Sequence, residues 1–313
     1  MPFTPVARNA DQWVGLALTD AEFALAEVRQ EAGRRPRVLR VLHGARPQGW
    51  SQWQTLRRRA ELGAVPIVLV LPISGYRLLG VDAPAVPRQD WPDALRWQVK
   101  DAVDFPVDDA AIDVLAVPPA NQDAPVRSAW VVVAPSATLR PLTEDCHTAR
   151  LPLEAVDITE TALRNLCALS GDTERARALL WQGSQQAILV VTWRGELLLA
   201  RRIDIAAEHL DQPDAGQRHM ALERMALELQ RTLDVCERQF SHAHVAGLTV
   251  LPGAAAQALC DELGQVLYIP VTPMSLQEHL DLSAAPELSD PRLLTPHLVA
   301  LGAALRQAVE VPA

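Results

Sequence analysis

Aromatic residues and cysteines are scarce in this sequence, and long uninterrupted apolar runs are missing. Phe, Tyr and Trp make up 4% of 313 residues, so the core must be built mainly from aliphatic side chains. The four cysteines (146, 167, 236 and 260) lie far apart without CxxC spacing, which indicates reduced thiols rather than disulfides. The longest apolar stretch, residues 64–76, contains proline and falls short of the ~20 residues of a membrane helix.

An excess of basic residues and the common phosphate-binding motifs are also missing. The formal net charge of −9 disfavours a nucleic-acid partner, and the short basic stretches 34–37 and 57–59 are typical of solvated faces. Neither GxGxxG nor GxxxxGK[ST] occurs. Residues 1–13 lack the apolar region of a signal peptide, so we expect a cytoplasmic protein without direct membrane insertion.

What the sequence does contain is an internal repeat. Each half is expected to hold three successive strands, a helix, a buried strand and a further helix. In the first half these are strands 13–18, 22–28 and 37–43, helix 51–62, strand 66–72, helix 136–149, strand 153–159 and helix 161–169. In the second half they are strands 177–183, 187–193 and 196–205, helix 218–240, strand 247–252, helix 253–264, strand 266–271 and a closing helix 297–309.

This repeat predicts an α/β protein with two lobes, residues 1–158 and 159–313. A separate unit at about residues 83–135 holds a helix and strands near 112–117 and 126–134, and we expect it to be a subdomain inserted in the first lobe. A duplicated core of this order is the plan of the actin-like, hexokinase-type ATPases, whose lobes have the ribonuclease H-like fold.

Three segments resemble PilM-type pilus assembly proteins. They are "DFPVDDAAIDV" (104–114), "ALELQRTLDVCERQF" (226–240) and "HLVALGAALRQ" (297–307), and together with "AVDITETALRNL" (155–166) they occur in the family's order over most of the chain. Among these proteins the sequence most resembles the MshI-like members of mannose-sensitive haemagglutinin (MSHA)-type pili. The resemblance implies a scaffold that captures the cytoplasmic N-terminal peptide of a PilN-like bitopic protein, and so lies at the inner membrane through that partner. It also allows contacts with a motor ATPase or platform protein, and homo-oligomers.

The same resemblance places a nucleotide cleft between two hairpins, each normally carrying an Asp near a Gly. The carboxylate would organise Mg²⁺, and the small residue would let backbone amides approach phosphate. Here Ala17 stands at the first Asp position, followed by Thr19, while Trp181 precedes Gly183 in the second hairpin. The adenosine loop keeps a single Gly253. We therefore expect no enzyme activity and no cofactor.

The stretch "LRWQVKDAVDFPVDD" (95–109) is the expected partner site. Asp90 is predicted to cap its helix with Asp93 at the capping-box position, and Phe105-Pro106 to end it. The helical wheel puts residues 91, 95, 99, 102 and 103 on one apolar stripe and Trp97 on the opposite side. A groove is expected here, with apolar walls and a basic rim. Its residues are Arg96, Trp97, Lys100, Phe105 and Pro106.

Other interpretations stay open at this stage. Trp97 is as well explained by packing beneath the inserted subdomain as by an interface. A switch of the same fold could bind ATP weakly, with Asp20 as a rearranged ligand; it would be stabilised by Mg-ATP. The chain could also be the cytoplasmic part of a GspL-like secretion protein. Neither His242 with His244 nor Cys146 with His147 has a spacing that supports metal binding or nucleophilic catalysis.

Overall fold

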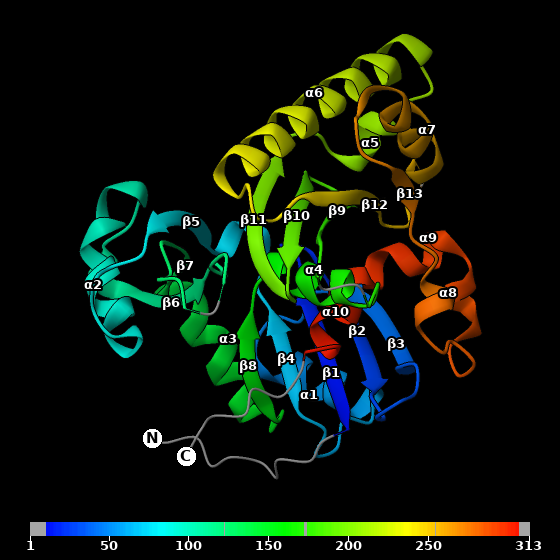
Figure 1. The fold of residues 1–313 in the computed structure, drawn as a ribbon. Helices are drawn as coiled ribbons and strands as arrows, with labels where there is room; N and C mark the ends of the chain where they lie inside the picture. Colours follow the sequence, from blue (N-terminus) through cyan, green and yellow to red (C-terminus); the bar gives the residue numbers. More distant parts are fainter. Residues whose placement is uncertain (1–10, 122, 172–173, 254, 307–313) are drawn as a thin grey trace.

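The computed structural model describes residues 11–121, 123–171, 174–253 and 255–306 (Figure 1). Its first sheet contains β1 (Gln12–Leu18), β2 (Glu22–Arg29), β3 (Arg37–Ala45), β4 (Ile67–Val70) and β8 (Leu153–Asp157), in the order β3-β2-β1-β4-β8. The second sheet contains β9 (Ala176–Gln182), β10 (Ala187–Trp193), β11 (Glu196–Ile203), β12 (Val245–Val250) and β13 (Val271–Pro273), in the order β11-β10-β9-β12-β13.

The two sheets repeat one plan. In each, the first three strands form an antiparallel meander. The fourth strand pairs in parallel with the first, and the fifth pairs in parallel with the fourth. The connecting helices are α1 (Trp50–Arg59) and α3 (Ser136–Thr148) in the first lobe, and α5 (Ala207–Leu210), α6 (Ala215–Gln239) and α7 (Ala256–Val266) in the second. The predicted duplication is confirmed.

Local sequence explains the regular elements. Strand β10, which lies between β11 and β9, is buried along its whole length, as its apolar run predicts. Arg194 and Gly195 form the predicted tight turn after it, and both have positive φ, as a two-residue hairpin turn requires. Helix α6 begins three residues before the prediction because the Asp214 carboxylate caps it by accepting the Gln217 amide.

Several predicted boundaries were wrong. Helix α7 continues through Gly264, which was expected to end it, and residues predicted as strand 266–271 contribute only Val271 to β13. The closing helix α10 begins at Leu298, and the part expected beyond Arg306 lies outside the described residues.

The last helix of each repeat crosses to the other repeat's sheet. Helix α4 (Thr159–Ala168) packs on β9, β10 and β11, whereas α10 (Leu298–Ala304) packs on β1, β2 and β4. Short helices α8 (Leu276–His279) and α9 (Pro291–Leu294) also lie beside the first lobe (Figure 1). The range 159–313 is thus not one lobe, because its final helix belongs to the core of the first sheet.

Two glycines bring α10 close to its neighbours. A Cβ at Gly15 of β1 would lie 1.9 Å from the Ala300 carbonyl oxygen, and a Cβ at Gly302 would lie 2.2 Å from that of Ala162 in α4. Both contacts are with backbone atoms, which cannot rotate away. The buried cluster around α4 and α10 contains residues of both sheets, so the two lobes share one core.

The inserted subdomain is a third, antiparallel sheet with one helix. Its strands are β5 (Arg77–Asp82), β6 (Ala110–Ala116) and β7 (Ser128–Pro135), in the order β5-β7-β6, and α2 (Trp91–Gln98) covers one face (Figure 1). Strand β5 lies before residue 83, so the subdomain begins about where β4 ends, earlier than predicted. Among the described residues, none of the helices is long and apolar enough to cross a membrane.

His297, which lies just before α10, gives the fold a predicted acid sensitivity. It is 5% exposed, and burial together with the charge of nearby His43 lowers its pKa to about 4. Between about pH 4 and 6.5 the unfolded chain binds the proton more readily, so acidification over this window lowers stability. From pH 7 to pH 5 we expect His297 to account for a loss of about 2 kcal/mol, an order-of-magnitude figure.

Urea denaturation of wild type and His297→Gln at the two pH values checks this. The variant should lose less stability on acidification than wild type does. The same change at the exposed His219 serves as the control for replacing a histidine. Equal acid sensitivity of wild type and His297→Gln would show that His297 is not responsible.

Candidate partner groove and interlobe cleft

A cleft of about 250 Å³ lies between the two lobes, where the resemblance places the nucleotide. It is bounded by the β1–β2 hairpin, the β9–β10 hairpin and the segment before α10. Ala17, Thr19, Trp181 and Gly183 all line it. Gly253 does not, but a Cβ on it would be 3.7 Å from the Gln182 carboxamide, which does line the cleft.

Three backbone amides of the first hairpin are engaged within the hairpin itself. The Thr19 amide donates to the Glu22 carbonyl, and the Thr19 hydroxyl accepts hydrogen bonds from the amides of Ala21 and Glu22. At position 17 the alanine side chain offers no ligand for a cation. The amides of Thr19, Ala21 and Glu22 are therefore engaged within the turn, and position 17 presents no carboxylate for Mg²⁺.

Asp20, the alternative ligand, is engaged at the cleft edge. Its carboxylate accepts a hydrogen bond from the Ser74 hydroxyl at 2.6 Å, and the side chain is exposed. Within the described residues, no group of three or more His, Cys, Asp or Glu side chains is arranged to hold a metal ion.

In the second hairpin, the glycine makes room for the tryptophan. A Cβ on Gly183 would lie 2.5 Å from the Trp181 ring, and the Gly183 amide donates to the Gln186 carbonyl. The Trp181 ring packs against the central core. The packing of Trp181 thus accounts for Gly183 without any phosphate contact.

The electrostatics of the cleft are unfavourable for a polyanion. Of the described residues that line it, none is lysine or arginine, whereas Asp20 and Glu22 add negative charge. The Gln182 side chain is 5% exposed and neither of its amide atoms has a hydrogen-bond partner among the described residues. Lysine and arginine are the side chains that pair with phosphate through charge-assisted hydrogen bonds, and the described lining contains neither.

Buried ionic contacts connect the lobes behind this cleft. Glu160 of α4 is fully buried; its carboxylate accepts from the Tyr76 hydroxyl and pairs with Arg202 of β11 at 2.9 Å. Burial, with Glu160 nearby, raises the Tyr76 pKa well above its usual value, so the hydroxyl stays protonated and donates. Nearby, Arg306 pairs with Asp157 at 3.1 Å. The lobes are joined here by the Tyr76–Glu160 hydrogen bond and by the Arg202 guanidinium, which donates to the Ile73 carbonyl at 3.3 Å.

Helix α2 is shorter than predicted and begins differently. The Asp90 side chain makes no capping hydrogen bond, and the α-helix ends at Gln98, well before Phe105-Pro106. Residues 91, 95 and 99 of the predicted stripe are buried, whereas Ala102 is exposed because the chain has left the α-helix by then.

The five predicted partner residues separate into two groups. Trp97 is 64% exposed and the Lys100 ammonium lies 5.7 Å from its ring, while Pro106 is also exposed. Arg96 instead donates to the carbonyls of Val107 and Ala110, and half-buried Phe105 packs in the subdomain core. Arg96 therefore holds the loop after α2 and is not available as a basic side chain at the rim of the predicted groove.

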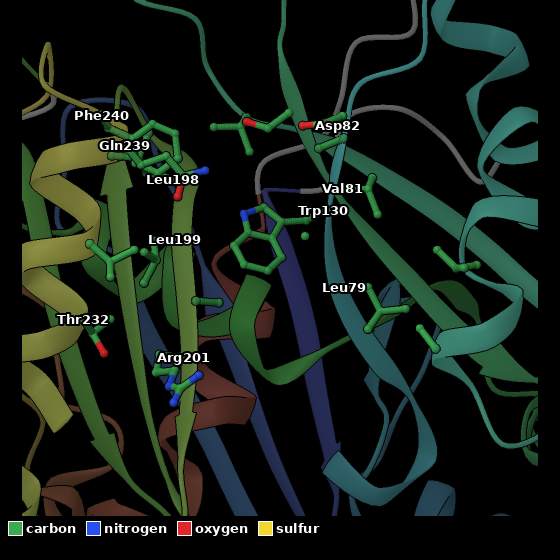
Figure 2. A pocket seen from close by; sticks show the side chains of 18 of the residues that line it. Leu79, Val81, Asp82, Trp130, Leu198, Leu199, Arg201, Thr232, Gln239 and Phe240 are labelled. Carbon is green, nitrogen blue, oxygen red and sulfur yellow. The ribbon is translucent and has the colours of Figure 1, made fainter.

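A larger groove lies between the inserted subdomain and the second lobe (Figure 2). It has a volume of about 860 Å³ and separates β5 and β7 from β11 and α6 of the second lobe. None of the five predicted partner residues lines it; α2 and its exit contribute Gln98, Val99 and Ala102. Trp130 of β7 lies in the middle of the groove, between β5 and β11 (Figure 2).

Sequence reasoning missed this groove for a simple reason. Strand β5 has only six residues and contains Gly80, so it was not recognised as a strand. A usable signal was Trp130, the single aromatic residue in the otherwise aliphatic run 129–134. The buried Glu160 was likewise missed, although an acidic residue in the first turn of an apolar helix can mark a paired charge.

Comparison with solved structures confirms the fold. A structure described as the PilM-PilN type IV pilus biogenesis complex matches with a TM-score of 0.70 and 19% identity, over 94% of this chain and 97% of that one. The cytoplasmic domain of EpsL from Vibrio cholerae, an inner-membrane component of its type II secretion system, matches at 0.49 with 14% identity, over 82% and 97%. A Bacteroides thetaiotaomicron protein with an actin-like ATPase fold also matches at 0.49, with 11% identity, over 90% and 96%.

The chain accordingly has the actin-like fold with two lobes and an inserted subdomain. No family model matches the sequence, and no curated protein matches it significantly.

Proposed function

We propose that this chain is a non-catalytic, cytoplasmic adaptor of a type IV pilus assembly platform, of the MSHA type that its sequence resembles. It works without a cofactor, and it lies at the inner membrane through the N-terminal peptide of a PilN-like protein. The observation that carries the proposal is the interlobe cleft. Its two hairpins carry Ala17 and Trp181 where carboxylates are needed, and no lysine or arginine among the described residues lines it.

Two further observations support docking at the inserted subdomain. The fold likeness to the PilM-PilN complex extends over nearly the whole of both chains, so the subdomain is included in the match. Trp97 is largely exposed on this subdomain with Lys100 beside it. Exposed tryptophan is costly in water and is enriched at interface hot spots. We therefore assign Trp97, Lys100 and Pro106 to the partner contact, with Arg96 and Phe105 supporting the loop that carries Pro106.

A peptide titration tests the proposal. The probe is the labelled N-terminal cytoplasmic peptide of the PilN-like protein encoded nearest to this chain, with a scrambled peptide as control. Wild type should bind the native peptide saturably, and Trp97→Ala should bind about tenfold or more weakly, as expected for an interface hot spot.

The control variant is Trp50→Ala, which removes another exposed tryptophan from a different surface, at the start of α1. It should bind like wild type. Equal binding of native and scrambled peptides would overturn the adaptor function. Equal affinity of wild type and Trp97→Ala for the native peptide would overturn only the assigned contact.

A further inference from the structure

The large groove between the inserted subdomain and the second lobe is bounded by two strand edges. Strand β5 is the outer strand of the third sheet, and β11 is the outer strand of the second sheet. Both line the groove (Figure 2). Unpaired edges present backbone donors and acceptors in a row, which is the feature that recruits extended peptides as added strands.

The register of β5 shows which backbone groups point outward. The Ala83 amide donates to the Arg127 carbonyl, and these residues continue the pairing in which Val81 faces Ala129. Hydrogen-bonded and non-hydrogen-bonded pairs alternate along an antiparallel ladder. The backbone groups of Val81 and Leu79 therefore face β7, whereas those of Leu78, Gly80 and Asp82 point away from it.

Strand β5 is a better acceptor of a new strand than β11. Its pairing with β7 is regular, whereas β11 is bulged at Leu198, where its register with β10 shifts. Bulges protect sheet edges from further pairing. Gly80, at the middle of β5, is exposed and has no side chain to obstruct an approaching backbone.

The walls and ends of the groove define the chemistry of its occupant. Leu79, Val81, Leu199 and Val235 give it apolar walls, and the Trp130 indole nitrogen is buried without an acceptor among the described residues. The volume of about 860 Å³ lies within the range of ligand sites. An apolar peptide segment fits these walls.

Charge is distributed unequally along the groove. Arg201 of β11 and Arg231 of α6 share one carboxylate, that of Glu228, at 3.4 and 3.6 Å, so one positive charge is not balanced there. Arg224 and Leu227 extend this surface along α6. Asp82 lies at the opposite end of the groove from Arg201 (Figure 2). This local basic surface stands out in a chain of net charge −9.

We propose that this groove is a second docking site, distinct from the Trp97 contact, that takes an extended peptide from another protein as an added strand on β5. About six residues pair with the outward groups of β5, antiparallel to it. The segment is apolar in its middle, and acidic side chains at its C-terminal end lie against Arg201 and Arg231. The opposite end of the segment lies near Asp82.

A selection experiment with a display library of random peptides, each of about twelve residues, tests this site. The immobilised full chain should enrich peptides with an apolar, β-branched run followed by Asp or Glu. Synthetic versions should bind Gly80→Pro about tenfold or more weakly than wild type, because proline removes the outward amide hydrogen at the middle of the edge. An edge strand tolerates proline when its amide does not serve the existing ladder.

Matched variants separate the backbone effect from other causes. Gly80→Ala adds a side chain but keeps the amide hydrogen, so it should bind within about threefold of wild type. Arg231→Glu should weaken binding about tenfold, whereas Arg292→Glu, an exposed charge on α9, should not. Circular dichroism and thermal denaturation confirm that each variant is folded.

Three results would overturn the inference. They are enrichment of no peptide above the blank resin, enrichment of basic peptides, or equal binding of the selected peptides to Gly80→Pro and Gly80→Ala. Formation of a dimer that competes with the peptides would identify a second copy of this chain as the occupant instead. The PilN-like peptide should bind Gly80→Pro as it binds wild type, so failure of this site leaves the proposed function standing.

Discussion

Replacing Arg202 with methionine should lower the free energy of unfolding by about 3 kcal/mol. The guanidinium pairs with Glu160 at 2.9 Å, and the Glu160 side chain is 1% exposed while that of Arg202 is 26% exposed. Removal of Arg202 leaves a buried carboxylate with the Tyr76 hydroxyl and no cation. Desolvation of an unpaired charge costs far more than loss of a surface ion pair. Urea denaturation monitored by tryptophan fluorescence measures the change.

The neighbouring residue provides the control. Arg201 pairs with Glu228 at 3.4 Å on the surface, where its side chain is 56% exposed, so Arg201→Met should cost less than about 1 kcal/mol. The double variant Glu160→Leu with Arg202→Met should recover at least half of the loss, because no buried charge remains. Losses of the same size for Arg201→Met and Arg202→Met would contradict the larger contribution assigned to the buried ion pair.

Replacing Gly302 with alanine should also lower the free energy of unfolding by about 2 to 3 kcal/mol. Alanine favours an α-helix over glycine by about 1 kcal/mol, so intrinsic propensity predicts the opposite sign. The expected loss arises because the new Cβ would lie 2.2 Å from the Ala162 carbonyl oxygen, and α10 must move away from α4. The same denaturation measurement applies.

Gly264 in α7 is the matched control, since a Cβ there would meet nothing within 4 Å. Gly264→Ala should stabilise the protein by up to about 1 kcal/mol. If Gly302→Ala also stabilises the protein, the close packing of α10 against α4 is contradicted. A Gly15→Ala variant tests the other side of α10, where the added Cβ would meet the Ala300 carbonyl oxygen at 1.9 Å.

The repeated architecture was predictable because burial dominates its strands. β1 is apolar after Gln12 and β10 is apolar except for Thr192, and turn residues such as Arg194-Gly195 separate the members of each meander. The inserted subdomain was predictable only in part. β5 is short and interrupted by Gly80, and its pairing with β7, about fifty residues later in sequence, leaves no local signal.

The site was predictable to a different degree in its two parts. Once the two hairpins are recognised, the sequence itself shows that positions 17 and 181 carry no carboxylate. The structure adds that Gly183 is needed to make room for the Trp181 ring. The groove depends on how close β11 and α6 lie to β5 in the folded chain. The hydrophobic periodicity of the sequence carries no information about that distance. The role of Arg96 could not be foreseen either, because its acceptors are backbone carbonyls of a loop.

The central claim is that the chain binds a partner peptide through a fold whose cleft no longer takes nucleotide. Isothermal titration calorimetry of the wild-type chain tests it most directly. The PilN-like peptide is titrated with and without millimolar Mg-ATP, and Mg-ATP is titrated alone. We predict a saturable peptide isotherm with the same affinity in both conditions, and no binding heat from Mg-ATP. A saturable Mg-ATP isotherm, or a peptide affinity that changes with nucleotide, would contradict the account.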